Sequence, residues 1–366
     1  MLNGMKPLSR SLRWGMVGGG GTSQIGYSHR CAALRDNVFT LLAGALDIDA
    51  ERGRQFGEQL GIAPERCYAD YKTLFAEEAK RPDGIEAVSV TTPNNTHFAI
   101  TKAALEAGKN VVVDKPFTVT LSQARELESL AKHCGRILSV FHNRRWDSDF
   151  LTVSALINEG QLGEVCYFES HFDRFRPQVR RRWREQAGPG SGIWYDLAPH
   201  LLDQVVVLFG LPVSITVDLA QLRPGAQSTD YFHAVLAYPQ RRVVLHGTLL
   251  AAAESARFIV HGSRASYIKY GLDPQEERLK NGERLPQEDW GYDMRDGTLT
   301  RAEGDERSQE KWLTLPGNYP AYYAAIRDAL NGVGENPVPA SEAIQIMTLI
   351  ELGIESARHR ATLSLV

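Results

Sequence analysis

Short apolar runs alternate with amphipathic stretches over about the first 140 residues, and this alternation constrains the fold more than any other feature. The apolar runs predict strands at 12–18, 38–47, 84–93, 110–114 and 136–142. The stretches between them predict helices at 23–36, 50–61, 96–108 and 121–135. Strands that alternate with helices require right-handed crossovers within one parallel sheet. The sequence therefore predicts an α/β domain over residues 1–143, built on a doubly wound parallel sheet.

The pattern changes after about Asn143. A helix at 149–160 leads to longer strands, which are expected at 164–172, 213–222, 231–238, 241–251, 256–262 and 265–271. The turn residues of "YPQRR" predict a hairpin between two of them. A second α/β domain with a large, mostly antiparallel sheet is thus expected over residues 144–366. It ends with two helices, and its polar segment 273–307 is expected to be a surface excursion.

The composition excludes several classes of partner. A chain of 366 residues suits two domains, and a net charge of −3 gives no general attraction to nucleic acid. No apolar run approaches the roughly 18 residues of a membrane span. The four cysteines lack a paired or histidine-flanked spacing, which favours a reducing compartment and predicts no metal site. We expect a cytoplasmic protein that binds neither nucleic acid nor membrane.

The stretch "GMVGGGGTSQIG" has the context of a phosphate-binding turn, since it follows a strand and opens a helix. Gly18 and Gly20 supply the GxG pair. Strict GxGxxG spacing puts Ser23 at the third position, so Gly26 is the alternative for close packing of the helix. The helix start offers N–H groups to a pyrophosphate. The expected cofactor-binding residues of this loop are Gly18, Gly20, Gly21, Ser23, Gln24 and Ile25.

Asp47 ends the second strand, where a carboxylate would accept both ribose hydroxyls of an adenosine. Because a 2′-phosphate beside this carboxylate would be repelled, the sequence favours NAD. Arg52 and Arg54 keep NADP as an alternative, and Arg52 is included among the cofactor-binding residues. The competing interpretation is a plain glycine-rich turn in which Asp47 only caps the next helix.

Two further loops follow strands at the same predicted sheet edge. Thr92, Pro93 and Asn94 come after one strand and His97 opens the next helix, so these four are expected to contact the cofactor. Helix capping in this loop is the structural alternative. Lys115 lies just past another strand and precedes a proline. We expect Lys115 to contact the cofactor and to polarise a substrate oxygen next to the nicotinamide, and the alternative is an exposed loop lysine.

The second predicted domain contains "GSGIWYDLAPHLLDQVVVLFG", whose apolar spacing and Pro199 predict a buried helix. Asp196 lies at or just before the helix start, four residues from His200, which places both on one side of that start. His200 is the natural general base or acid because the imidazole titrates near neutral pH. The alternative makes Asp196 a cap and His200 a core histidine.

An arginine-rich segment, "RFRPQVRRRWR", precedes this helix. A nucleic-acid stripe is poorly supported in an acidic chain. The segment is more consistent with a loop that lines an anionic or polyol substrate pocket with Trp183 as a wall, or with a solvated loop that pairs with a partner subunit. Asn143, Trp183 and Tyr195 are the expected pocket-wall residues, and Asn143 is also placed at the cofactor.

Together these motifs resemble the Gfo/Idh/MocA family of NAD(P)-dependent oxidoreductases. The resemblance rests on the glycine loop, "TPN" at 92–94, "DKP" at 114–116 and "DLAPH" at 196–200. It implies a Rossmann domain followed by an α/β domain whose sheet often forms an oligomer interface. It also implies that Lys115, Asp196 and His200 act together on a substrate hydroxyl or carbonyl.

From about Lys102 onward the chain looks like the scyllo-inositol dehydrogenase-like branch of this family, whereas the first hundred residues look like another branch. The sequence therefore suggests a mosaic, natural or engineered, with a join around residues 94–109. We expect a homo-oligomeric dehydrogenase that transfers a hydride between NAD and a cyclic polyol or sugar. The alternatives are an NADPH-dependent reductase of a keto-inositol, an NAD-dependent glycoside hydrolase and a non-catalytic dinucleotide-binding regulator.

Overall fold

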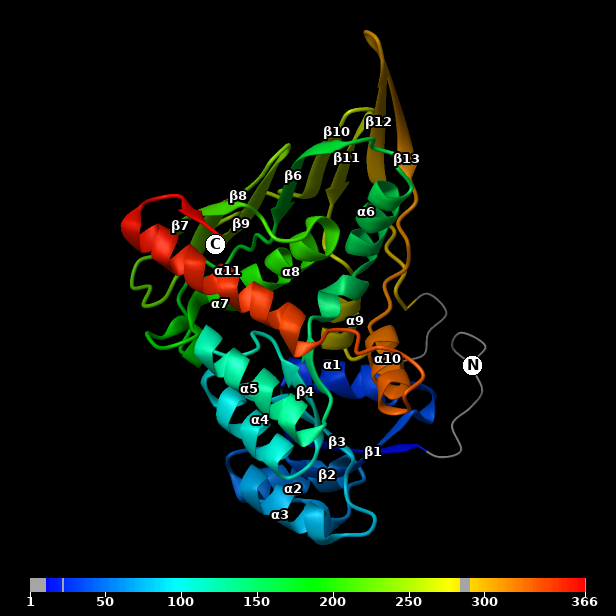
Figure 1. Cartoon of the computed structure of the whole chain (residues 1–366), viewed down its shortest axis with the longest axis vertical. Coiled ribbons are helices and arrows are strands. Elements are labelled where there is room, and N and C mark those ends of the chain that lie inside the picture. Colours follow the sequence, from blue (N-terminus) through cyan, green and yellow to red (C-terminus); the bar gives the residue numbers. More distant parts are fainter. Residues whose placement is uncertain (1–10, 22, 284–289, 366) are drawn as a thin grey trace. The chain divides into compact units, whose positions relative to one another are not determined.

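The computed structural model describes residues 11–21, 23–283 and 290–365 (Figure 1). These residues form two compact units. The first combines the described part of 1–143 with segments from 276–288 and 319–344, and the second comprises the described parts of 144–275, 289–318 and 345–366. The expected domain boundary between residues 143 and 144 stays a prediction. The structure adds that two later segments of the chain pack within the first unit.

The first unit is built on a five-stranded parallel sheet. Its strands are β1 (Leu12–Gly18), β2 (Phe39–Ala45), β3 (Ala87–Thr91), β4 (Asn110–Asp114) and β5 (Leu138–Phe141), in the order β2-β1-β3-β4-β5. The residues of β3 are all buried, as expected for a parallel strand covered on both faces. The strand order reverses between β1 and β3, which is where ligands bind in open α/β sheets. The predicted doubly wound parallel sheet is confirmed.

Helices connect these strands (Figure 1). They are α1 (Gln24–Ala33), α2 (Ala50–Gln59), α3 (Tyr71–Lys80), α4 (His97–Glu106) and α5 (Leu121–Cys134). Of these, α3 was not predicted from the sequence, although Asp70 caps it through the N–H groups of Lys72 and Thr73. A late helix, α10 (Pro320–Leu330), packs against α1, and its Tyr323 hydroxyl lies 2.6 Å from Nδ1 of His29.

The second unit contains a nine-stranded sheet. Its strands are β6 (Val165–His171), β7 (Ser214–Ala220), β8 (Tyr231–Tyr238), β9 (Arg241–Thr248), β10 (Ala256–Gly262), β11 (Ala265–Tyr270), β12 (Gly297–Glu303), β13 (Glu306–Trp312) and β14 (Leu363–Ser364). The order is β13-β12-β11-β10-β6-β9-β8-β7-β14, and the pairing is antiparallel except between β6 and β9. The predicted hairpin joins β8 to β9. The mostly antiparallel sheet is confirmed.

The expectation of a surface excursion at 273–307 is wrong for part of this segment. It contains α9 (Gln275–Lys280), β12 and the beginning of β13, and Leu299 of β12 is fully buried. Strands at the edge of a sheet expose much of their surface, so their sequence lacks the strong apolar alternation that marks a central strand. Part of the segment, residues 284–289, lies outside the described residues.

The remaining helices are α6 (Ser148–Asn158), α7 (Gly192–Asp196), α8 (Ala198–Phe209) and α11 (Ala340–His359). Helix α8 buries Leu201, Leu202 and Val205 completely and packs on β9, while Pro199 lies in its first turn and Gly210 caps its end, as predicted. None of the helices in the described chain is long and apolar enough to cross a membrane.

Candidate active site

The glycine loop after β1 has a backbone that only glycine fits. Gly18, Gly19 and Gly21 have φ values of 76°, 74° and 55°, which lie in the left-handed region. A Cβ atom on Gly18 would lie 2.7 Å from the carbonyl oxygen of Thr91, and one on Gly20 would lie 2.5 Å from that of Leu46. The loop therefore presents bare backbone at the carboxyl end of β1, which fits the close approach of a pyrophosphate.

The start of α1 follows this loop directly. Ser23 caps the helix, because its hydroxyl accepts a hydrogen bond from the backbone N–H of Gly26 over 3.3 Å. A side chain on Gly26 would overlap the backbone of Gly19. The close packing that the motif assigns to a third glycine thus falls to Gly26. Gln24 and Ile25 form the first helical residues behind the loop.

Asp47 lies two residues past the end of β2 and faces Arg52. Arg52 donates to Oδ1 of Asp47 from Nη2 over 2.8 Å, and this hydrogen bond is the main reason that the pKa of the Asp47 carboxyl is lowered. The cap of α2 is Asp49, which accepts from the N–H of Arg52. Asp47 is therefore not the helix cap that the competing interpretation proposed, although its half-buried carboxylate also accepts a hydrogen bond from the backbone N–H of Asp49 over 2.9 Å.

The loop after β3 is tied to the loop after β4 by His97. This histidine is fully buried, and its two ring nitrogens lie 2.9 Å from the carbonyl oxygens of Thr92 and Pro116. Burial lowers the pKa of His97. Since both nitrogens face the backbone, the geometry favours a positioning role for His97 over the direct cofactor contact expected from the sequence. Asn94 is buried as well and begins a 3₁₀ turn at 94–96.

Lys115 follows β4 at the same edge of the sheet as the glycine loop, because β1, β3 and β4 are parallel neighbours. Its side chain is half-buried, its backbone N–H donates to Oδ1 of Asp114 over 2.8 Å, and the Lys115–Pro116 peptide bond is cis. Asn143, which follows β5, is buried at this edge too. The sheet topology thus gathers the loops that carry Gly18, Thr92 and Lys115.

The second unit places Asp196 at the end of α7 and His200 in the first turn of α8. His200 is largely buried, and its ring stacks near Phe172, with ring centroids 6.3 Å apart. Phe172 directly follows β6, and the guanidinium of Arg174 lies 4.8 Å from its ring centroid. Phe172 was not among the residues expected at the site, although it is the last residue of the strand predicted at 164–172.

Arginines from the arginine-rich segment surround Asp196. Arg184 Nε lies 3.4 Å from its Oδ1, and Arg174 Nη1 lies 4.0 Å from its Oδ2. Trp183 stacks with the Arg184 guanidinium, whose carbon lies 4.4 Å from a Trp183 ring centroid. The structure therefore brings Asp196, Trp183 and two of the arginines together in one cluster.

Two other groups in this region have perturbed titration. Burial, and then repulsion from Arg174, Arg182 and Arg180, lowers the pKa of Arg176 to about 10. Burial raises the pKa of Tyr195, expected at the pocket wall, to about 12. The cluster around Asp196 is thus strongly positive.

Lys115 belongs to the first unit and Asp196 and His200 to the second, so their joint action stays a prediction.

The fold and the glycine loop define the class of protein, which is an oxidoreductase with an NAD-binding Rossmann domain. The profile "Oxidoreductase family, NAD-binding Rossmann fold" matches residues 12–142, and "Oxidoreductase family, C-terminal alpha/beta domain" matches residues 154–365. The chain belongs to the Gfo/Idh/MocA family, as the sequence motifs indicated.

Three relatives give the range of similarity. The uncharacterized oxidoreductase YdgJ of Escherichia coli is 82% identical over 281 residues, which cover 77% of this chain and 81% of YdgJ. The NADP(+)-dependent scyllo-inositol 2-dehydrogenase IolW of Bacillus subtilis is 38% identical over 90% of this chain and 98% of its own. An inositol dehydrogenase homolog from Azotobacter vinelandii, solved with NADH and myo-inositol, superposes with a TM-score of 0.81 at 30% identity, covering 99% of this chain and 100% of that one.

Proposed function

We propose that this oxidoreductase transfers a hydride between NAD and the CH–OH carbon of a cyclic polyol or sugar of the inositol type. The observation that carries the proposal is the position of Lys115 at the end of β4, on the sheet edge that also presents the glycine loop. A cationic side chain at that edge is suited to stabilise negative charge on an oxygen next to a bound nicotinamide. IolW and the A. vinelandii homolog, whose names refer to inositols, support this substrate class.

His200, Asp196 and Lys115 have different roles in the proposed reaction. In the oxidative direction His200 takes the hydroxyl proton, and Asp196 orients the imidazole or binds the reacting hydroxyl. Arg174 and Arg184 lie close enough to pair with the Asp196 carboxylate. Lys115 stabilises the developing alkoxide. Bound NAD supplies the hydride acceptor, and the residues expected to hold it are Gly18, Gly20, Gly21, Ser23, Gln24, Ile25, Asp47, Arg52, Thr92, Pro93, Asn94 and Asn143.

A panel of inositols and sugars, monitored at the absorbance band of NADH, tests this proposal. Lys115→Ala is expected to lower kcat by roughly 10²- to 10⁴-fold on the best substrate. Lys102→Ala is the matched control, because Lys102 is an exposed residue of α4 that pairs with Glu126. Full activity of Lys115→Ala on every substrate that the wild-type protein oxidises would remove Lys115 from the mechanism.

A second candidate is an NADPH-dependent reductase of a keto-inositol or similar carbonyl. Two observations favour it: Arg52 lies beside Asp47, and IolW is named for its use of NADP(+). Turnover with the two cofactors separates the candidates. A preference for NADP of more than about tenfold, which corresponds to about 1.4 kcal/mol, would contradict our interpretation of Asp47.

We further infer a homo-oligomer, on the analogy of the family, and size-exclusion chromatography with light scattering tests it.

The cytoplasmic location and the mosaic origin stay predictions. YdgJ supports the mosaic in one respect, since its alignment covers only 77% of this chain although the aligned part is 82% identical.

A further inference from the structure

Three histidines form a row across the middle of the nine-stranded sheet. His171 of β6 is the register partner of His246 of β9, and His246 is the partner of His233 of β8. The ring centroids of His171 and His246 lie 5.1 Å apart, and those of His246 and His233 lie 6.0 Å apart. All three side chains are half-buried, and they alternate with the fully buried residues of their strands. The row therefore lies on the face of the sheet opposite to its apolar core.

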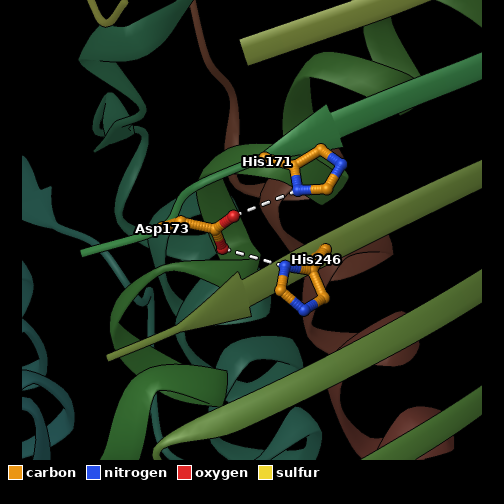
Figure 2. Close-up of side chains that lie close together, drawn as sticks. All are labelled: His171, Asp173 and His246. Atoms are coloured by element: carbon orange, nitrogen blue, oxygen red, sulfur yellow. Dashed lines mark hydrogen bonds and ion pairs between the residues drawn. The ribbon is translucent and has the colours of Figure 1, made fainter. Parts of the chain in front are cut away.

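Asp173 joins two of these histidines (Figure 2). Its Oδ2 lies 3.1 Å from Nδ1 of His171, and its Oδ1 lies 2.8 Å from Nδ1 of His246. The backbone N–H of Thr248 also donates to Oδ1, which holds the carboxylate in place. Figure 2 shows both rings turning Nδ1 toward the carboxylate between them. One ligand atom from each residue lies within 4.8 Å of the others, which is close enough for a single ion to contact all three.

Glu169 engages the other nitrogen of His171. Its Oε1 lies 2.6 Å from Nε2 of His171, and its other oxygen accepts a hydrogen bond from the hydroxyl of Tyr167. A neutral imidazole carries one N–H. If that N–H serves Glu169, Nδ1 presents a lone pair to the carboxylate of Asp173. Two electron-rich atoms at this distance require a proton or a metal ion between them, and the proton can belong to the ring or to a carboxyl group.

We propose that His171, Asp173 and His246 bind a divalent cation of the zinc class. Two imidazoles and one carboxylate suit Zn²⁺, Co²⁺ or Ni²⁺ better than Mg²⁺ or Ca²⁺. Glu169 behind His171 reproduces the carboxylate–histidine–metal arrangement that orients metal ligands. Among the described residues, the ion-pair partners of Glu169 and Asp173 are histidines, so the site has negative charge to attract a cation.

The ligand atoms need to move only slightly apart to admit an ion. Ligand atoms at about 2.1 Å from a tetrahedral metal lie about 3.4 Å apart. The ring nitrogens of His171 and His246 lie slightly closer than that to the carboxylate oxygens. With three protein ligands, a fourth position is left for water or another group. The site uses none of Lys115, Asp196 and His200, although its ligands His171 and Asp173 flank Phe172, whose ring stacks near His200.

No metal site was expected from the sequence, because the cysteines lack a metal-ligand spacing. The ligands proposed here are far apart in the chain. His171 and Asp173 are separated by more than 70 residues from His246, and they meet only because β6 pairs with β9 in parallel. These three ligands therefore do not form a short sequence motif of the kind that identifies zinc sites.

Metal analysis of the full-length protein tests the proposal. The protein is stripped with a chelator, titrated with Zn²⁺ by calorimetry, and examined with Co²⁺ for the d–d absorption of a low-symmetry N/O site. We expect about one ion per chain. His246→Gln and Asp173→Asn should each weaken Zn²⁺ binding by about 100-fold or more, and Glu169→Gln by about 10-fold, since orienting residues typically contribute 10- to 100-fold.

His261→Gln is the matched control. His261 belongs to the neighbouring strand β10, is also half-buried, and lies within hydrogen-bond distance of the Ser266 hydroxyl. Its ring stacks on Tyr167, but it contributes no ligand atom to the cluster. It should bind Zn²⁺ like the wild type. Circular dichroism confirms that each variant is folded. Absence of stoichiometric Zn²⁺ binding in the wild type, or equal binding in His246→Gln, would overturn the proposal and leave protons shared between the imidazoles and the carboxylates.

Discussion

Nη2 of Arg52 donates a hydrogen bond to Oδ1 of Asp47 over 2.8 Å, so a guanidinium and a carboxylate share the end of β2. Both side chains are partly exposed there. The carboxylate is suited to accept ribose hydroxyls, whereas the guanidinium is suited to pair with a 2′-phosphate. The pair thus contains a group for each cofactor, and we predict that the carboxylate favours NAD.

Asp47→Ser is therefore expected to shift the preference toward NADP. The substitution removes the repulsion of a 2′-phosphate and releases Arg52 to bind it. The ratio of kcat/KM for NADP to that for NAD should rise by about tenfold or more, which corresponds to about 1.4 kcal/mol. Adding Arg52→Ala to this variant should abolish the gain. An unchanged ratio in Asp47→Ser would show that neither residue faces the adenosine ribose.

Gly26→Ala is expected to damage the cofactor loop. The added methyl group would overlap the backbone of Gly19, which cannot move without displacing the turn. Overpacking of this kind costs roughly 1–3 kcal/mol. A fluorescence titration with NADH should show weaker binding, and the Tm should fall. Gly188→Ala is the control for stability, since no atom lies within 4 Å of its Cβ position and its Tm should be nearly unchanged.

His29 is expected to destabilise the folded protein in acid. Burial, followed by the charge of Arg30, lowers the pKa of His29 to about 3 from an ordinary value of 6.5. Between these values the unfolded chain binds a proton that the folded chain does not. The free energy of unfolding therefore falls as the pH decreases from about 6.5 toward 3, by up to about 1.4 kcal/mol per pH unit, and His29 contributes no slope above that range.

Urea unfolding at several pH values, with His29→Gln as the variant, checks this prediction. The variant removes the titrating group, so its stability should depend less steeply on pH between 4 and 6 than that of the wild type. His359→Gln, at an exposed position near the end of α11, should keep the wild-type slope. Identical slopes for His29→Gln and wild type would contradict the assignment.

Arg257 of β10 is expected to be a large contributor to the stability of the second unit. Its Nε donates to Oδ2 of Asp149 over 3.0 Å, and its Nη2 donates to Oε1 of Gln204 in α8 over 2.8 Å. Both ions of this pair are almost completely buried. Arg257→Met leaves Asp149 without its compensating charge, which typically costs about 3–5 kcal/mol.

A double-mutant cycle in chemical denaturation measures this pair. Because Asp149→Asn removes the uncompensated charge, the double variant should recover part of the stability that Arg257→Met loses. The coupling energy should lie between about 0.5 and 3 kcal/mol. Strictly additive losses would mean that the two side chains contribute independently.

Much of the fold could be predicted from the sequence because its signals are local. The strands β1, β8 and β10 have the bounds that their apolar runs predicted, and Pro199 and Gly210 delimit α8 as expected. Helix α3 and the strands β12 and β13 were missed. The sequences of β12 and β13 are polar, so that pairing with neighbouring strands, not periodicity, determines their structure. Helix α3 has a local signal in the Asp70 cap and in its buried Leu74 and Phe75, which the prediction overlooked.

The sequence by itself determined the residue types of the candidate site and the turns that carry them. The glycine loop, Asp47, Lys115 and the Asp196–His200 pair could be selected because each follows or begins a recognisable element. Tertiary structure alone decided which groups meet across the chain. Arg174 and Arg184 come beside Asp196, and β6 pairs with β9 so that His246 meets His171 and Asp173. The physical reason is that backbone pairing and packing, which act between distant segments, set these distances, and no local spacing encodes them.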